Sequence, residues 1–239
     1  MIGRHGSWLD LTVATYAAMV ASRIHWAQAG YRDGEFAAIL GHGGSNINGE
    51  DYTPELGAAL RETLLRPVGQ WCCFWWPHPT IGARVHRDAL AWIEKHRPPV
   101  RWLPERPVFR AVLEGAAAPF FAACRSRRVI VVGPEHLSRL DLLDPVAHVP
   151  VPAATAWKAA DALADETCAA VDAVGGEPLV LVAAGMGANL IIHRAWPRLR
   201  GRATVLDIGS TLDPYCGVYS RGPFRERGWK ETIMPRNRP

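Results

Sequence analysis

Two carboxylates flank a glycine near the amino end of the chain, in the stretch Tyr31-Arg32-Asp33-Gly34-Glu35-Phe36. Carboxylate oxygens suit hard cations such as Mg²⁺ and Mn²⁺, which often keep open positions for the phosphates of a bound nucleotide. Because Gly34 permits a sharp backbone turn, Asp33 and Glu35 are predicted to converge on one divalent metal ion. The alternative is a surface turn with two solvated acids, which is the commoner meaning of so short a motif.

A second stretch that can bind polar ligands follows at residues 41–49, where the sequence is GHGGSNING. The side chains of Asn46 and Asn48 can hydrogen-bond sugar hydroxyls or phosphates, and His42 is a candidate for a proton acceptor in catalysis. A plain surface loop explains the same composition equally well.

The turn Gly185-Met186-Gly187-Ala188-Asn189 joins an apolar run to a helical pattern. Glycines at such a turn let backbone N–H groups approach a phosphate, and Asn189 can read a base or a ribose. The third glycine of the dinucleotide fingerprint is replaced by Leu190. A dinucleotide-dependent oxidoreductase is therefore supported by Gly185 and Gly187 alone.

The elements that must position these residues follow from apolar periodicity. Val/Ile/Leu runs that alternate with helical patterns predict a Rossmann-like α/β fold, a mostly parallel sheet with helices on both faces. Strands are expected at 68–76, 129–133, 146–151, 179–185 and 203–209, and helices at 10–28, 53–66, 81–95, 107–124, 134–143, 155–174 and 186–196. Gly133, Gly185 and Gly209 then mark one crevice at the carboxyl ends of the strands, with Asp207 near it.

The length and the charge distribution indicate one domain, residues 1–239, with a basic C-terminal extension over residues 216–239. The net charge is +4, and residues 221–239 carry six basic and two acidic side chains, so the excess charge lies in the tail. A basic terminal segment can meet the phosphates of a nucleotide or a nucleic acid. A frayed, solvated terminus is at least as common an explanation.

Five cysteines without a C-x-x-C spacing fit neither a zinc site nor a disulfide framework, so reduced and mostly buried thiols are expected. Apolar stretches end well before the ~20 residues that a membrane span requires, and no export signal is visible. These features lead us to expect a soluble, cytoplasmic protein. Three tryptophans, Trp71, Trp75 and Trp76, are expected to pack in the core or to form a stacking platform.

The order of these motifs resembles the GT-D-fold glycosyltransferases, a family with a D-x-E metal motif. The resemblance covers about residues 20–215. It is carried by the Asp33-Gly34-Glu35 triplet, the strand 129–133, the segment 149–152 before a helix with Trp157, and the pair LVLVAAGMGA (179–188) and LDIGSTLDPY (206–215). The D-I-G match at 207–209 is its most specific element.

The resemblance implies an enzyme, a hexosyltransferase that moves a sugar from a nucleoside-diphosphate sugar, UDP-glucose for example, to a hydroxyl acceptor. Asp33 and Glu35 would hold Mn²⁺ or Mg²⁺ on the diphosphate, and Arg32 would add positive charge. The substrate would lie against Arg32, Gly34, Asn46, Asn48, Trp157, Gly185, Gly187, Asn189 and Asp207. The usual acceptor in such a family would be a glycan or a glycosylated protein, while the basic tail and the Trp-rich segment of this chain allow a hydroxymethylated base in DNA.

The chain departs from the family pattern after D-I-G. Ser210 stands where the family has histidine, and Leu212, Asp213 and Pro214 replace its acidic pair, although Tyr215 keeps register. Asp213 is the first candidate for the acceptor-activating base, and capping of the turn before Pro214 is its alternative role. Because of these departures, a non-catalytic nucleotide-binding or nucleic-acid-binding module is the second hypothesis.

Overall fold

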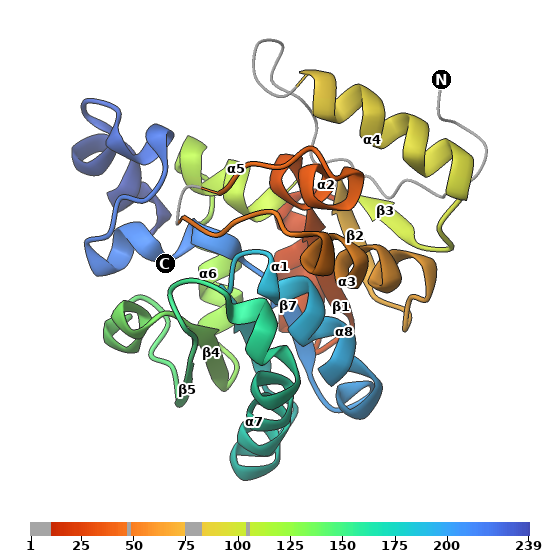
Figure 1. Cartoon of the computed structure of the whole chain (residues 1–239). Coiled ribbons are helices and arrows are strands. Elements are labelled where there is room, and N and C mark those ends of the chain that lie inside the picture. Colours follow the sequence, from red (N-terminus) through yellow and green to blue (C-terminus); the bar gives the residue numbers. More distant parts are fainter. Residues whose placement is uncertain (1–10, 47–48, 75–82, 104–105) are drawn as a thin grey trace.

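A computed structural model of the chain describes residues 11–46, 49–74, 83–103 and 106–239 (Figure 1). Its centre is a seven-stranded sheet in the order β3-β2-β1-β7-β6-β4-β5, in which every neighbouring pair is parallel. The strands are β1 (Ala27–Tyr31), β2 (Trp71–Phe74), β3 (Arg101–Leu103), β4 (Val129–Gly133), β5 (Ala147–Pro150), β6 (Leu179–Val182) and β7 (Thr204–Asp207). The parallel α/β class predicted from the sequence is confirmed.

Helices connect and cover the strands. The α-helices are α1 (Val13–Ala21), α2 (Asp33–Leu40), α3 (Pro54–Leu65), α4 (Ala83–His96), α5 (Pro107–Glu114), α6 (Ala118–Arg125), α7 (Ala160–Val174) and α8 (Gly187–Leu199). Shorter 3₁₀ turns are η1 (Glu135–Arg139), η2 (Ala156–Ala159), η3 (Gly209–Thr211), η4 (Asp213–Cys216), η5 (Gly222–Arg225) and η7 (Met234–Asn237), and η6 (Trp229–Ile233) is a π turn.

Each face of the sheet has its own core. Alternate strand residues such as Ile130 and Val132 pack with α2, α3, α4, α7 and α8, whereas Val129 and Val131 pack with α1, α5, α6 and the C-terminal turns. This alternation is the period of two of a strand that is buried on both faces. The four described cysteine thiols, Cys72, Cys124, Cys168 and Cys216, are free, and the first three are buried.

Three expected helices differ from the structure, and the short strand β3 was not expected. The helix expected over 10–28 ends at Ala21, and the five buried residues AQAGY that follow form β1 in the middle of the sheet. The segment after Pro98 contains the short strand β3. The helix expected over 107–124 is two helices that bend by 119° near Gly115, whose φ is +73°. The helix expected over 134–143 is only the short turn η1.

The C-terminal segment packs against the domain rather than fraying. It lies beside α5 and α6 (blue beside lime in Figure 1), and Phe224 and Trp229 are buried in the second core. Asn237 is fully buried, where it accepts a hydrogen bond from Ala117 N (2.9 Å) and donates one to Val112 O (2.8 Å).

Within the described ranges, no single helix is long and apolar enough to cross a membrane, and α5 and α6 meet the length and composition test only as a bent pair.

Candidate active site

The strand order reverses between β1 and β7, which are neighbours although they are the first and last strands in sequence. The chain leaves β1 toward α2 on one face and leaves β7 toward η3 and the C-terminal segment on the other. In open α/β sheets, ligands bind outside the carboxyl ends of the strands at such a switch point. The candidate site is therefore at the ends of β1 and β7.

Arg32 and Asp207 join the two strands at this point. The Arg32 Nη2 atom donates to Asp207 Oδ2 at 3.2 Å, and Asp207 Oδ1 accepts from the backbone N–H of Gly209 at 2.9 Å. A Cβ on Gly30 would lie 2.3 Å from Asp207 Oδ2 and 2.9 Å from Arg32 Nη2. A side chain at position 30 would therefore clash with the ion pair, and glycine leaves the space that the pair occupies.

Asn189, near the start of α8, binds the same strand from the other side. Its Oδ1 accepts from Gly30 N at 3.0 Å, and its side chain is almost fully buried. Within the described ranges, neither Asn189 Nδ2 nor Arg32 Nε has a hydrogen-bond partner, although both are buried. Unpaired buried donors cost about 1–3 kcal/mol each, so these two atoms are groups that a ligand oxygen would satisfy.

The Asp33-Gly34-Glu35 triplet forms the first turn of α2. The backbone N–H of Arg32 donates to Glu35 Oε2 at 2.9 Å, which is half of a capping box. Gly34 is thus helical, and the sharp turn expected there is absent from this part of the structure. Tyr52 explains its small size, since a Cβ at Gly34 would lie 3.1 Å from the Tyr52 hydroxyl.

The two carboxylates differ in burial but act on the same neighbours. Glu35 is buried and Asp33 is exposed. Burial is the main reason that the pKa of Glu35 is raised, and Arg32 partly opposes this. Burial and the charges of Asp33 and Glu35 raise the pKa of Tyr52 to about 12. Both carboxylates also act on Arg221, so they border one region.

Asp33 and Glu35 stand two residues apart on a helix, so their side chains do not face each other, and a divalent cation held by them would be shared with a ligand. The described residues contain no cluster of three or more His, Cys, Asp or Glu side chains arranged as a metal cage. Mg²⁺-type ions on nucleotides are commonly held by one or two carboxylates together with phosphate oxygens and water. The buried Glu35 carboxylate, whose pKa is raised, is a group that a nearby cation would stabilise in its charged form.

The loop after α2 returns to the site and supplies a residue that the sequence analysis missed. Glu50 is buried, and it is tied to Asn46 because Asn46 Nδ2 donates to Glu50 Oε2 (2.9 Å) and Glu50 N donates to Asn46 Oδ1 (3.0 Å). Burial raises the pKa of Glu50. Its carboxylate faces Gly185, whose added Cβ would lie 3.9 Å away. The predicted ligand residue Asn48 lies outside the described residues.

The glycines of the β6–α8 turn have separate structural reasons. Gly185 is exposed with φ +55°, and it turns the chain out of β6. A Cβ on Gly187 would lie 2.9 Å from Ala156 Cβ and from the backbone N of Trp157, so this glycine lets η2 pack on α8. Trp157 is half-buried, and Lys158 Nζ lies 5.6 Å from the centre of its ring.

Asp213 follows β7 and is buried between two partners. Its Oδ1 lies 2.9 Å from His136 Nε2, and its Oδ2 accepts from Ser220 Oγ at 2.7 Å. His136 lies on η1, which follows β4, and no motif in the sequence singles it out. Trp71 is a core residue here, packed on Trp26 with ring centroids 6.1 Å apart, and Trp75 and Trp76 lie outside the described residues.

His42 is the predicted site residue that the fold places elsewhere. It follows the C-terminal end of α2, about 12 Å along the helix from Asp33, and its Nε2 lies 3.5 Å from Asp88 Oδ2 on α4.

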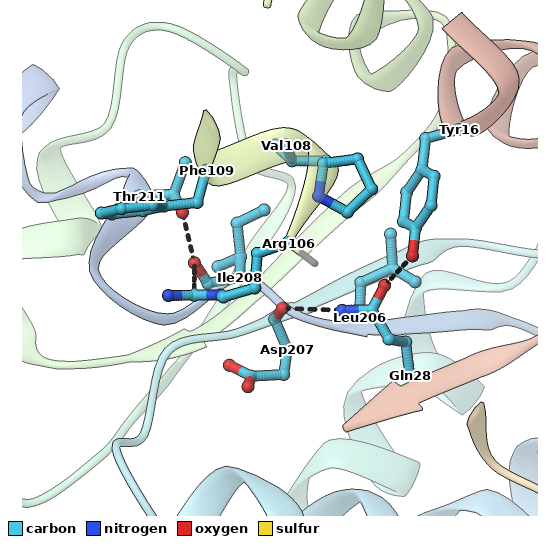
Figure 2. Close-up of a pocket in the computed structure, with 10 residues that line it drawn as sticks. Tyr16, Gln28, Arg106, Val108, Phe109, Leu206, Asp207, Ile208 and Thr211 are labelled. Atoms are coloured by element: carbon cyan, nitrogen blue, oxygen red, sulfur yellow. Dashed lines mark hydrogen bonds between the residues drawn. The ribbon is translucent and has the colours of Figure 1, made fainter. Parts of the chain in front are cut away.

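A narrow gap lies beside Asp207, on the side of the sheet that α1 and α5 cover (Figure 2). Gln28 Nε2 donates to the backbone oxygen of Asp207 at 3.5 Å, and Arg106 Nη2 donates to Ile208 O at 2.9 Å. In Figure 2 the Asp207 carboxylate points away from Gln28. The gap measures about 10 Å³, room for roughly one water molecule, so it is too small for a substrate.

No known family model and no curated protein matches the chain. Solved structures do match its fold. One is "A New Glycosyltransferase (DUF1792) from Streptococcus sanguinis", with a TM-score of 0.59, 18% identity, and coverage of 87% of this chain and 84% of that one. Another is described as "The highly conserved domain of unknown function 1792 has a distinct glycosyltransferase fold", with a TM-score of 0.56, 15% identity, and coverage of 89% and 82%.

A third match, the "Selenomethionine substituted structure of domain of unknown function 1792 (DUF1792)", has a TM-score of 0.59 at 14% identity and covers 89% of this chain and 82% of that one. The agreement extends over nearly the whole domain in each case. The fold expected from the D-x-E and D-I-G motifs is therefore confirmed, and this chain has the distinct glycosyltransferase fold of the DUF1792 structures.

Proposed function

We propose that this protein is a metal-dependent glycosyltransferase that moves a sugar from a nucleoside-diphosphate sugar to an acceptor hydroxyl. The observation that carries the proposal is the fold shared with structures described as glycosyltransferases, together with acidic and basic groups at its switch point. A UDP-sugar, with UDP-glucose as the first choice, is the proposed donor.

The donor diphosphate would lie over the ends of β1 and β7. Arg32 and the Asn189 amide have buried donors without partners there, which suits phosphate or ribose oxygens. Asp33 and Glu35 would hold Mn²⁺ or Mg²⁺, which neutralises negative charge on a departing diphosphate. The ligand would also lie close to the backbone at Gly34, at Asp207 and at the turn that contains Gly185 and Gly187.

Proton transfer from the acceptor is assigned to the pair formed by Asp213 and His136. Both oxygens of Asp213 already accept hydrogen bonds, from His136 and Ser220. Within the described part of the chain, the other ring nitrogen of His136, Nδ1, has no hydrogen-bond partner. Asp213 would orient the ring through Nε2, so that Nδ1 can accept the proton of the acceptor hydroxyl. His42 is a less suitable base because it follows the end of α2 that lies away from the Asp33-Gly34-Glu35 triplet.

The acceptor is proposed to be a glycan, a glycosylated protein, or a hydroxymethylated base in DNA. Asn46, Asn48 and Trp157 belong to the segments that border the site and would contact a sugar. A DNA acceptor would use the basic tail, where Arg225, Arg227 and Lys230 line an open hollow of about 730 Å³. That version predicts DNA affinity that falls steeply with added salt, and binding indifferent to salt would eliminate it.

The test of the proposal is donor hydrolysis. The protein is incubated with Mn²⁺ and a panel of nucleotide sugars, and free sugar is measured, since a transferase slowly leaks sugar to water. Asp33→Asn should abolish metal-dependent nucleotide affinity and hydrolysis because the exposed ligand is lost, while the thermal unfolding midpoint stays unchanged.

The matched control is Glu166→Gln, which removes one exposed carboxylate from the middle of α7, a helix that holds none of the proposed ligand residues. It should behave as the wild type. Equal metal-dependent affinity in Asp33→Asn and the wild type would refute the metal site. Metal-dependent nucleotide binding without hydrolysis of any donor would instead favour a non-catalytic nucleotide-binding module.

A further inference from the structure

The C-terminal segment is fastened to the candidate site by two consecutive residues. Ser220 Oγ donates to Asp213 Oδ2 at 2.7 Å, and Arg221 Nε donates to Ser210 Oγ at 3.1 Å. The backbone N–H of Val218 adds a third bond, to Asp213 O at 3.0 Å. Residues 218–221 are thus held against the turns that follow β7, at the edge of the sheet where the ligand is expected.

A short chain of contacts links Arg221 to Arg32. Arg32 pairs with Asp207, Asp207 accepts from Gly209 N, and the next residue, Ser210, accepts from Arg221. The two guanidinium groups therefore approach the same strand end from opposite ends of the sequence. Their like charges repel, and a bound anion would reduce that repulsion.

Arg221 has no acidic partner of its own among the residues that the structure describes. No Asp or Glu oxygen of these residues lies within 4.0 Å of its guanidinium nitrogens, and its one hydrogen bond is the neutral bond from Nε to Ser210. Its side chain is partly buried. Burial and then the charge of Arg32 lower its pKa, and the charges of Glu35, Asp213 and Asp33 partly oppose this. The terminal nitrogens, Nη1 and Nη2, remain available for a ligand.

We infer that Arg221 and Arg32 together form an anion site for the diphosphate of the donor, so that the C-terminal segment is part of the binding site. A guanidinium presents parallel N–H donors that match phosphate oxygens, and Nε is already fixed by Ser210. Arg32 Nε, which is buried without a partner, supplies another donor. The diphosphate identity rests on the proposed function, but the anion site does not.

The experiment measures the affinity for inorganic pyrophosphate by calorimetry, with and without Mg²⁺, for the full chain. Arg221→Gln should bind pyrophosphate about 10- to 100-fold more weakly than the wild type, as expected for the loss of charge-assisted hydrogen bonds. Arg221→Lys keeps the positive charge but loses the parallel N–H donors of the guanidinium, so its loss of pyrophosphate affinity should be intermediate. This second variant keeps the test informative if the glutamine variant does not fold.

Arg236→Gln is the matched control, because it removes the same charge from an exposed position in the same segment. Its pyrophosphate affinity should equal that of the wild type. Equal losses in Arg236→Gln and Arg221→Gln, wild-type affinity in Arg221→Gln, or absence of pyrophosphate binding to the wild type would each overturn the inference. Donor hydrolysis tests transfer separately: specific pyrophosphate binding without hydrolysis of any donor would keep the anion site and reject the transferase.

Discussion

At the scale of single residues, the site is built from groups that are incompletely satisfied. Glu35 is a buried carboxylate whose hydrogen bond comes from a neutral backbone N–H, and Arg32 and Asn189 keep buried donors unpaired. Each of these costs stability in the ligand-free protein. Their concentration at one strand end is the pattern expected of a site that a charged ligand completes.

Glu35→Gln tests this cost. Because burial raises the pKa of Glu35 above its unfolded value, the folded protein binds the proton more tightly, and stability falls as the pH rises from the unfolded pKa through the folded pKa. The variant should therefore unfold at a higher temperature than the wild type at pH 8, and this gain should vanish below about pH 4.

Divalent metal supplies the complementary measurement. Saturating Mn²⁺ should raise the unfolding midpoint of the wild type but not that of Glu35→Gln, because a ligand stabilises only the form that binds it. For the pH prediction, the contradicting outcome is a higher unfolding temperature of Glu35→Gln relative to the wild type that persists unchanged at about pH 3.5. The charge of Glu35 would then not be the source of the difference.

At the scale of elements, close packing of short turns decides where the site residues stand. The 3₁₀ turn η2 rests on the first residue of α8, and the first turn of α2 rests on Tyr52. These contacts set the helix starts against the strand ends. Two glycines, Gly187 and Gly34, allow the approach, and both belong to motifs that the sequence analysis read as ligand-binding.

Gly187→Ala should destabilise the protein by about 1–3 kcal/mol, because the added methyl group meets backbone rather than a flexible side chain. Denaturant unfolding measures the loss. Gly222→Ala is the control, since nothing lies within 4 Å of a Cβ there and its φ is not positive. A stability of Gly187→Ala equal to that of Gly222→Ala would mean that η2 does not pack as tightly as described.

At the scale of the whole molecule, the first and last strands of the chain lie side by side at the centre of the sheet. β1 and β7 are neighbours, and the residues after β7 continue into a segment that covers α5 and α6 before it ends (Figure 1). The basic tail is therefore part of the domain. Its buried anchor, Asn237, bonds both the end of α5 and the start of α6.

Asn237→Ala should release this anchor. Leaving Ala117 N and Val112 O without partners should cost about 2–4 kcal/mol, from two unpaired buried groups. Limited proteolysis followed by mass spectrometry should show faster cleavage within residues 222–239, while the sheet core resists. The control is Glu231→Gln, a substitution at an exposed position of the same segment. Cleavage at the wild-type rate in Asn237→Ala would contradict the anchoring role.

The sequence by itself determined the class of the fold, the strands β2 and β4 to β7, and the alignment of Gly133, Gly185 and Gly209 at one edge. Apolar periodicity and glycine at strand ends are local signals, so they can be read without neighbours. The strand β1 was misread because AQAGY has no such pattern, and its place between β2 and β7 is fixed by partners distant in sequence.

Only the tertiary structure decided which polar residues share the site. The pairings of Arg32 with Asp207, His136 with Asp213, and Ser210 with Arg221 join residues 11 to 175 positions apart. Such contacts depend on the order of the strands and on the path of the C-terminal segment, which no local pattern encodes. For that reason His136, Glu50 and Arg221 could be assigned to the candidate site only from the folded chain. His42, which was predicted to belong to the site, lies beyond the C-terminal end of α2.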